Sequence, residues 1–337
     1  MDEVKEGSLP TDGVPLETQL GQSEPRLIDP LQQPLLEPAH AIFVGPEGLR
    51  AGWRFLLYVG MWRVFLVLLR TLVPYVQPHG VRGIWQDLIG ELEFLASAFL
   101  PALVMGAIEN RSLGDYGLPL RNAFGKAFWV GMFWGIVAIT VLVLAIGGLG
   151  DFSLGGLALH GGRILKFAAF WGGFFVIVGL FEEFLLRGYT QFTLTQGIGF
   201  WPAALLLSTF FAALHFGNPG ETWMGLLAVA VIGLFFCLTL RRTGNLWFAV
   251  GFHASWDWGE SYLYSVPDSG GMVTGHLMRS SFHGSPWLTG GSVGPEGSVL
   301  VFVVMALTWL AFDQAYPNVR YQTKDIHHSQ TPHPYHE

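Results

Sequence analysis

Residues 164–187 read ILKFAAFWGGFFVIVGLFEEFLLR, and this stretch decides the fold. The apolar run before Glu182 carries one charge, Lys166, and is long enough to cross a bilayer. It ends in two adjacent carboxylates, Glu182 and Glu183, followed by Arg187. Each such charge costs about 2.5–3.5 kcal/mol to place in a membrane, and it is retained where it pairs, faces a wet cavity or takes part in chemistry. The stretch is therefore the centre of a candidate site.

The composition is typical of a polytopic membrane protein. Of the 337 residues, 51% are hydrophobic and only 13% are charged, whereas soluble domains carry about 25% charged residues. The net charge of −7 arises mostly from the two tails, and the absence of a basic stripe argues against a nucleic-acid partner. The single cysteine, Cys237, excludes an intrachain disulfide and a cysteine zinc site, and its apolar neighbours predict a buried core residue.

Eight membrane-length segments predict an all-α fold, in which about eight transmembrane helices enclose an intramembrane polar cavity. We expect these segments at 53–76, 85–108, 124–149, 164–194, 200–216, 222–240, 246–264 and 298–316. In the second segment, Asp87 and Glu91 share a face and indicate an interfacial helix end.

Three parts of the chain differ in composition. Residues 1–48 are polar and rich in proline, which predicts a disordered cytoplasmic tail. Residues 49–318 form the transmembrane domain, with its polar motifs at 164–264. Residues 319–337 hold four histidines and predict a flexible C-terminal tail.

Lysine and arginine outside the helices predict the orientation. With both termini in the cytoplasm, ten of these residues lie inside and four outside, as the positive-inside rule favours. The Gly- and Pro-rich loop 265–297 would then face outside. No organelle signal is evident, so we expect a multi-pass protein of the bacterial inner membrane.

The adjacent carboxylates divide into two roles. Glu183 and Arg187 are four residues apart, so we expect them to pair on one helix face. Glu182 lies about 100° around the helix and is left unpaired, which suits a general base. The alternative for this motif is an ion pair that only locks two helices together.

The second motif is Phe211-Ala212-Ala213-Leu214-His215. Residues 195–199 predict a chain reversal, and Glu182 and His215 each lie about sixteen residues from its midpoint, which at about 1.5 Å per residue gives them equal height. We therefore expect a Glu–His pair that holds and deprotonates one water molecule. On its own, His215 would be interpreted as a capped histidine at a helix end.

The third motif places His253 and Asp257 four residues apart on one helix face. Such a pair could polarise a carbonyl group as an oxyanion hole or bind a metal ion. The alternative is a buried hydrogen bond without a chemical role.

The three motifs together resemble the CPBP family, the CAAX-processing and bacteriocin-processing intramembrane proteases, also called the ABI or CAAX prenyl protease 2 family. The family pattern is EExxxR, then FxxxH, then HxxxN or HxxxD, in successive helices. This sequence matches it in order over residues 164–264, with Glu182-Glu183…Arg187, Phe211…His215 and His253…Asp257.

The resemblance implies an eight-helix intramembrane endopeptidase that cleaves membrane-associated or prenylated (CAAX-type) proteins without a metal cofactor. If the roles of the family's motif residues apply to this sequence, Glu182 and His215 would activate the water. His253 and Asp257 would stabilise the oxyanion. The supporting residues would be Glu183 and Arg187. Asp257 departs from the Asn of the prenyl-processing members. Because an ionised Asp cannot donate to an oxyanion, Asp257 is either protonated or orients His253.

Two other interpretations stay open at this point. A divalent metal such as zinc could be held by His215, His253 and a carboxylate. Alternatively, the chain is a non-catalytic membrane scaffold or bacteriocin-immunity protein that keeps the cluster as a buried polar lock. Under the enzymatic interpretation, the expected partners are membrane lipid and a membrane-embedded or lipidated peptide or protein substrate.

Overall fold

The computed structural model describes residues 42–45, 48–77 and 81–322. Most of the predicted tails, 1–48 and 319–337, lies outside the described residues. The predicted limits of the transmembrane domain therefore stay predictions.

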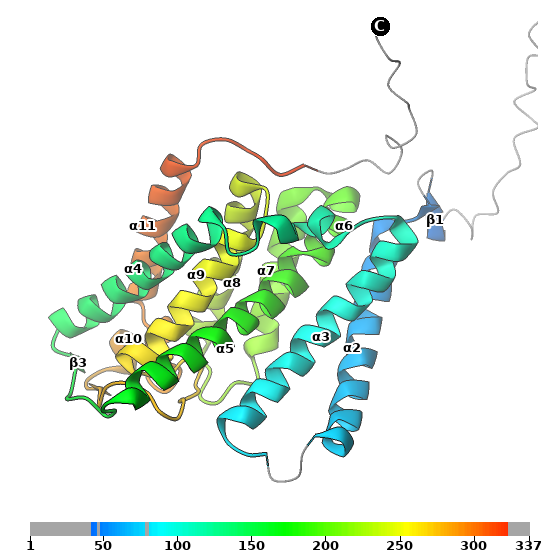
Figure 1. The fold of residues 1–337 in the computed structure, drawn as a ribbon. Helices are drawn as coiled ribbons and strands as arrows, with labels where there is room; N and C mark the ends of the chain where they lie inside the picture. The colour runs from blue at the N-terminus through cyan, green and yellow to red at the C-terminus, as the bar shows by residue number, and fades with distance from the viewer. Residues whose placement is uncertain (1–41, 46–47, 78–80, 323–337) are drawn as a thin grey trace, which may run out of the picture. The chain divides into compact units, whose positions relative to one another are not determined.

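Among its described residues, the unit from Phe43 onward is mainly helical (Figure 1). The α-helices are α2 (Ala51–Val76), α3 (Ile84–Glu109), α4 (Lys126–Gly148), α5 (Gly162–Arg187), α6 (Tyr189–Ile198), α7 (Phe200–His215), α8 (Trp223–Thr243), α9 (Trp247–Trp258), α10 (Pro286–Thr289) and α11 (Leu300–Ala315). Short helical turns are η2 (Leu113–Tyr116), η3 (Leu120–Asn122), η4 (Gly259–Tyr264) and η5 (Pro295–Gly297). Two small antiparallel pairs join β1 (Val44–Gly45) to β2 (Gly48–Leu49) and β3 (Phe152–Ser153) to β4 (Ser281–Phe282).

The all-α polytopic prediction is confirmed. Among the described residues, five helical stretches are long and apolar enough to cross a membrane: α2, α3, α4, α8, and α5 continued into α6. The helices α7 and α11 are apolar but shorter. Each predicted segment overlaps at least one of these helices or α9, and the seventh segment continues from α9 into η4.

The predicted fourth segment, 164–194, is not one continuous helix. The helix α5 ends before Gly188, whose backbone (φ −83°, ψ −119°) is not helical, and α6 begins directly after it. The argument that Glu182 and His215 lie at equal height assumed a straight helix up to the reversal at 195–199. That argument is therefore wrong, because the chain changes direction between Glu182 and the reversal.

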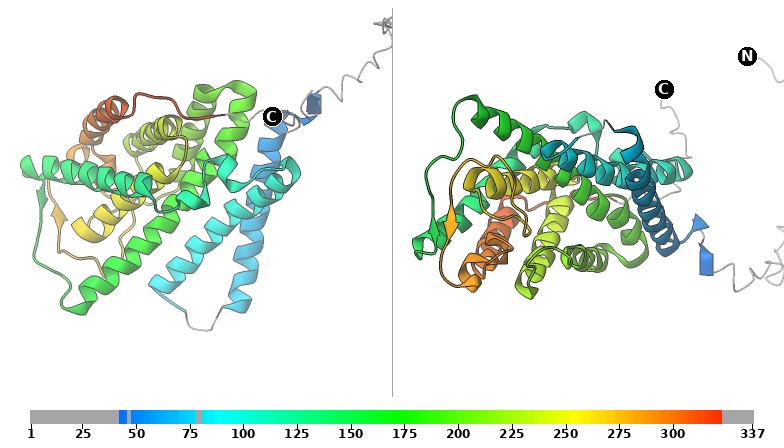
Figure 2. Two further views of the ribbon diagram at one scale, coloured as in Figure 1. Left: turned by 45° about the horizontal axis from the view of Figure 1, so that its top comes forward. Right: turned by 90° about the horizontal axis from the view of Figure 1, so that it is seen from below.

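Glycine contacts fix the helix that carries the third motif. The helix α9 lies between α4 and α5, as the views in Figures 1 and 2 agree. A Cβ atom on Gly131 or Gly135 of α4, or on Gly251 of α9, would lie only 2.1 or 2.2 Å from a backbone carbonyl oxygen of the other helix. Small residues at these positions let the two backbones touch. The contact holds His253 in place along α9.

A further glycine sets the approach of α5 to α9. A Cβ atom on Gly179 would lie 3.1 Å from the carbonyl oxygen of Val250 and 3.5 Å from Cβ of His253. Gly179 lies about one helical turn before the paired glutamates. The close approach therefore places the charged end of α5 against His253.

A buried ion pair connects α2 to α3 and α6. Arg54 lies 3.4 Å from Glu109, and it also donates a hydrogen bond of 2.5 Å to Gln196. The hydroxyl of Tyr189 donates to the other oxygen of Glu109, at 2.6 Å. These contacts attach α2 and α3 to the break that follows α5.

Candidate active site

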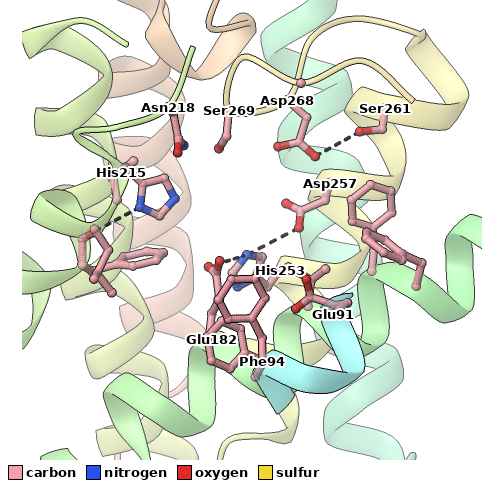
Figure 3. Close-up of a pocket in the computed structure, with 18 of the residues that line it drawn as sticks. Glu91, Phe94, Glu182, His215, Asn218, His253, Asp257, Ser261, Asp268 and Ser269 are labelled. Carbon is pink, nitrogen blue, oxygen red and sulfur yellow. Dashed lines mark hydrogen bonds and ion pairs between the residues drawn. The ribbon is translucent and has the colours of Figure 1, made fainter. Parts of the chain in front are cut away.

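Residues of all three motifs line one cavity of about 760 Å³, which is formed by α2, α3, α5, α7, α8, α9 and the loop that follows η4. One part of its wall is aromatic and includes Trp171, Phe174 and Phe175 of α5. Its polar lining gathers around α9 and the loop, as Figure 3 shows, and includes Glu91, Glu182, His215, Asn218, His253, Asp257, Ser261, Asp268 and Ser269. The cavity therefore combines an apolar surface with a dense group of ionisable side chains.

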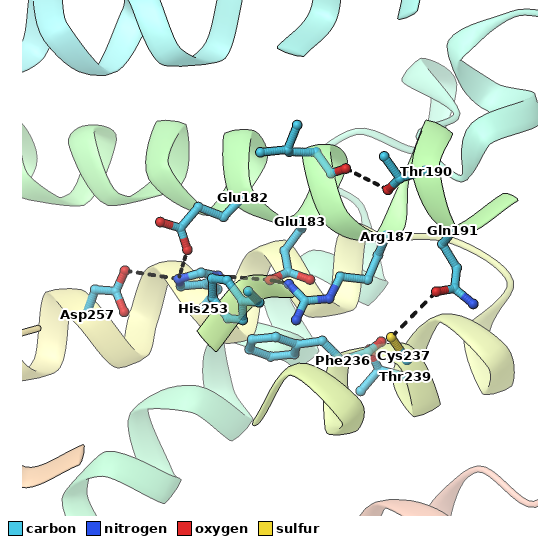
Figure 4. Close-up of polar contacts among 12 residues, drawn as sticks. Glu182, Glu183, Arg187, Thr190, Gln191, Phe236, Cys237, Thr239, His253 and Asp257 are labelled. Atoms are coloured by element: carbon cyan, nitrogen blue, oxygen red, sulfur yellow. Dashed lines mark hydrogen bonds and ion pairs between the residues drawn. The ribbon is translucent and has the colours of Figure 1, made fainter. Parts of the chain in front are cut away.

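His253 lies at the centre of this group and contacts three carboxylates (Figure 4). Its Nδ1 lies 3.0 Å from Oε1 of Glu183, while its Nε2 lies 3.5 Å from both Glu182 and Asp257. An imidazole ring donates from both nitrogens only when it is protonated. Because both nitrogens face carboxylate oxygens, the surroundings favour a cationic ring.

The predicted pairing of Glu183 with Arg187 is confirmed. Nη1 of Arg187 lies 3.2 Å from Oε1 of Glu183, and both side chains are fully buried. The guanidinium also lies 4.6 Å from the ring centre of Phe211 and 5.6 Å from that of Phe236, which stabilises the cation further. Since the same oxygen of Glu183 also contacts His253, the pair anchors the ring to α5.

Glu182 is not unpaired, contrary to the prediction. Its Oε2 lies 3.5 Å from Nε2 of His253, because α5 packs on α9 and not only on α7. Its side chain is 23% exposed, whereas that of Glu183 is 0% exposed. Of the two adjacent glutamates, Glu182 is thus the one that reaches the cavity.

His215 lies across the cavity from Glu182 (Figure 3). Its Nδ1 lies 3.0 Å from the carbonyl oxygen of Phe211, one turn back along α7. A carbonyl oxygen only accepts, so Nδ1 carries the proton and Nε2 of the neutral ring is an acceptor. Among the described contacts, none joins His215 directly to Glu182, and the predicted pair that holds one water molecule between them stays a prediction.

The four predicted catalytic residues thus line one cavity, and three of them form a contact network. Glu182, His253 and Asp257 are linked through Nε2 of His253, while His215 faces them from α7.

Asp87 and Glu91, which were predicted to mark an interfacial helix end and not a site, both line the cavity. The buried Oε1 of Glu91 has no hydrogen-bond partner among the described residues. Glu91 lies two turns inside an apolar helix. An ionisable residue at such a position is the sequence signal that predicts a functional site. Asp268, in the loop after η4, and Glu296 of η5 also line the cavity. Their spacing in the sequence does not connect them to the three motifs.

The structure does not assemble the zinc ligands of the metal alternative. Within the described part of the chain, the side chains whose ligand atoms converge within 4.8 Å are Glu260, Asp268 and Glu296, and neither histidine belongs to that group. His215 and His253 lie on different sides of the cavity and do not form a ready-made set with one carboxylate.

Comparison with known proteins agrees with the geometry. A search of curated proteins found no match. Residues 164–259 match the family model described as type II CAAX prenyl endopeptidase Rce1-like, and this segment contains all three motifs. The family is one of peptidases, and the helices around the segment make the chain an integral membrane protein. Over residues 164–259 the chain therefore carries a domain similar to the Rce1-like type II CAAX prenyl endopeptidases, which confirms the predicted resemblance to the CAAX-processing family.

Proposed function

We propose that this protein is an intramembrane endopeptidase of the glutamate type that cleaves membrane-associated or lipidated substrates. The observation that carries the proposal is that Glu182, His215, His253 and Asp257 all line one cavity among membrane-length helices. The family match supports peptidase activity in general.

In the proposed reaction, Glu182 is the general base for a water molecule held between it and Nε2 of His215. As the water oxygen attacks the carbonyl carbon, its proton moves to Glu182 and the carbonyl electrons move to the oxygen. The resulting oxyanion accepts a hydrogen bond from Nε2–H of His253. Glu182 then returns the proton to the leaving nitrogen, and the peptide bond breaks.

The remaining residues of the motifs hold the donor in place. Glu183 accepts from Nδ1 of His253 and so directs the opposite nitrogen towards the cavity. Asp257 lies on the same face of α9 as His253, at 3.5 Å from Nε2. This contact supports an orienting role for Asp257 and leaves oxyanion stabilisation to His253.

The substrate class follows from the lining of the cavity. A prenyl or acyl chain is apolar, and the aromatic wall formed by Trp171, Phe174 and Phe175 is suited to bury it. The scissile peptide would then lie at the polar end, near His253. We propose a lipidated peptide of the CAAX type as the substrate, cleaved in a bacterial inner membrane.

The test is cleavage of quenched fluorescent lipidated peptides by the protein in liposomes. Glu182→Gln should lose at least about 10³-fold in kcat/KM, because the general base is gone, while its thermal unfolding stays near that of the wild type. Glu93→Gln, on α3 but outside the cavity lining, is the matched control and should cleave normally.

Three results would overturn the proposal. Full activity of Glu182→Gln would exclude Glu182 as the base. Loss of wild-type activity with a zinc-selective chelator would favour the metal alternative. A protein that cleaves none of a broad lipidated and non-lipidated set would favour the scaffold or immunity interpretation.

A further inference from the structure

A second group of carboxylates lies beside the cavity, outside the three motifs. Glu260 comes from η4, Asp268 from the loop after it, and Glu296 from η5 before α11. One ligand oxygen of each lies within 4.8 Å of the others. Three negative charges from three parts of the chain are thus brought together.

Glu260 shows that this group lacks a partner. Its side chain is fully buried, and neither carboxylate oxygen has a hydrogen-bond partner among the described residues. The indole N–H of Trp256 is a side-chain donor directed at this carboxyl, but it does not reach normal hydrogen-bond geometry. A buried ionised carboxylate without a partner costs several kcal/mol, so Glu260 is either protonated or bound to a cation.

The other two carboxylates have few donors. Asp268 accepts one hydrogen bond from the hydroxyl of Ser261 at 3.0 Å, shown in Figure 3, and Glu296 accepts one from the backbone nitrogen of Ser269 at 2.6 Å. No lysine or arginine of the described residues forms an ion pair with the three carboxylates. Burial raises the pKa of Asp268 to about 6 and that of Glu296 to about 7, and the charge of Asp268 adds to the second shift. When they are ionised together the three carboxylates repel one another, and the charges that His253 and His215 carry when protonated offset only part of this repulsion.

The loop that carries these ligands is tightly built. The backbone nitrogen of Gly270 donates to the carbonyl oxygen of Val293 at 2.8 Å. Gly294, at φ +119°, lies so close to Pro267 that a Cβ atom there would be 2.0 Å from the Pro267 carbonyl oxygen. The two chain segments that contain Asp268 and Glu296 are thus held against each other.

We propose that Glu260, Asp268 and Glu296 bind one hard divalent cation, Ca²⁺ in preference to Zn²⁺, which fastens this loop and the start of α11 to the end of α9. Oxygen-only ligands select hard cations over zinc. With Ca–O distances of about 2.3–2.6 Å, ligands on opposite sides of Ca²⁺ are up to about 5 Å apart, whereas Mg²⁺ needs them within about 4.2 Å. The site would lie one turn beyond Asp257 and form part of the cavity wall.

The binding test uses the full-length protein, freed of metal by chelation and exchanged into detergent at pH 7.5. At about 5 mM Ca²⁺, the range in which exposed extracytoplasmic sites fill, we expect the melting temperature to rise by about 3–6 °C. Isothermal titration should give one Ca²⁺ per chain. Zn²⁺ and ionic-strength-matched K⁺ should leave the melting temperature unchanged.

Two variants locate the cation. Glu260→Gln removes one ligand charge without changing its size, so it should melt at or above the cation-free wild type and lose at least tenfold in Ca²⁺ affinity. Glu296→Gln, a second ligand change, should do the same. Glu93→Gln, a carboxylate on α3, should keep the full response.

Three outcomes would overturn the proposal. These are a wild type that does not bind Ca²⁺ at about 5 mM, a Glu260→Gln variant that responds like the wild type, or a response to Zn²⁺ that exceeds that to Ca²⁺. In the first case the carboxyl groups are neutralised by protonation and not by a cation. Because the readouts are melting and titration, they succeed or fail independently of peptide cleavage.

Discussion

His253 shows which part of the site could be predicted at the scale of single residues. The spacing of four between His253 and Asp257, and between Glu183 and Arg187, was enough to predict that the members of each pair share a helix face. The spacing says nothing about which helices pack together. The contact of Glu182 with His253, which the spacing did not predict, arises from the packing of α5 on α9, and that packing depends on residues far apart in the chain.

Asp257 is predicted to orient His253 and not to react. Asp257→Asn keeps an acceptor of the same size beside Nε2, so kcat/KM should stay within about tenfold of the wild type. Asp257→Ala removes the contact and should lose about 10²-fold, the cost of a misplaced catalytic group. Steady-state cleavage of a lipidated peptide by the two variants measures the difference. Equal losses in both would show that the carboxylate charge itself is needed.

Arg187 is predicted to stabilise the fold. Its loss leaves Glu183 buried and charged, with His253 as its one remaining partner in the described structure, and breaking a buried ion pair costs about 3–5 kcal/mol. Arg187→Met should therefore unfold at a clearly lower temperature in detergent. The double variant Arg187→Met with Glu183→Gln, which removes both charges, should recover part of the loss. A double variant as unstable as Arg187→Met alone would contradict this account.

At the scale of elements, hydrophobic length predicted the helices well and their breaks poorly. Seven of the eight segments end within a few residues of the observed helices because apolar runs are bounded by polar or glycine-rich turns. The fourth segment was wrong because the apolar pattern continues through Gly188, and one glycine in such a run is a weak signal for a break. The break matters because Glu182 does not lie on one straight helix that runs to the reversal at 195–199.

The contact between α4 and α9 provides a prediction for this scale. Gly131→Ala places a Cβ atom 2.1 Å from a carbonyl oxygen of α9, so the helices must separate. We expect a loss of about 1–3 kcal/mol, as for other overpacked sites, together with reduced cleavage because His253 moves with α9. Gly148→Ala at the end of the same helix meets nothing within 4 Å and should be neutral. The melting temperatures of both variants in detergent test this prediction. Equal melting temperatures for Gly131→Ala and Gly148→Ala would contradict the packing argument.

At the scale of the whole molecule, the cavity is lined in part by residues outside the segment that resembles known proteases. The family match ends at residue 259, yet Glu91, Asp268 and Glu296 also line the cavity. Sequence patterns identified the residues within the matched segment because those follow fixed spacings. The others come from α3 and from a loop, and only the three-dimensional path of the chain brings them to His253.

The orientation of the molecule decides from which side Ca²⁺ reaches the loop. The excess of lysine and arginine predicts that the loop with Met272 faces outside and that η3 with Leu120 faces the cytoplasm. Both side chains are exposed, at 54% and 66%, whereas the single native cysteine, Cys237, is fully buried and supplies an unreactive background. In intact cells, a membrane-impermeant thiol reagent should label Met272→Cys at once and Leu120→Cys only after permeabilisation. The reverse pattern would place the proposed cation site in the cytoplasm. There free Ca²⁺ is too scarce for a weak site, and the loop would have to be held by Mg²⁺ or by protons.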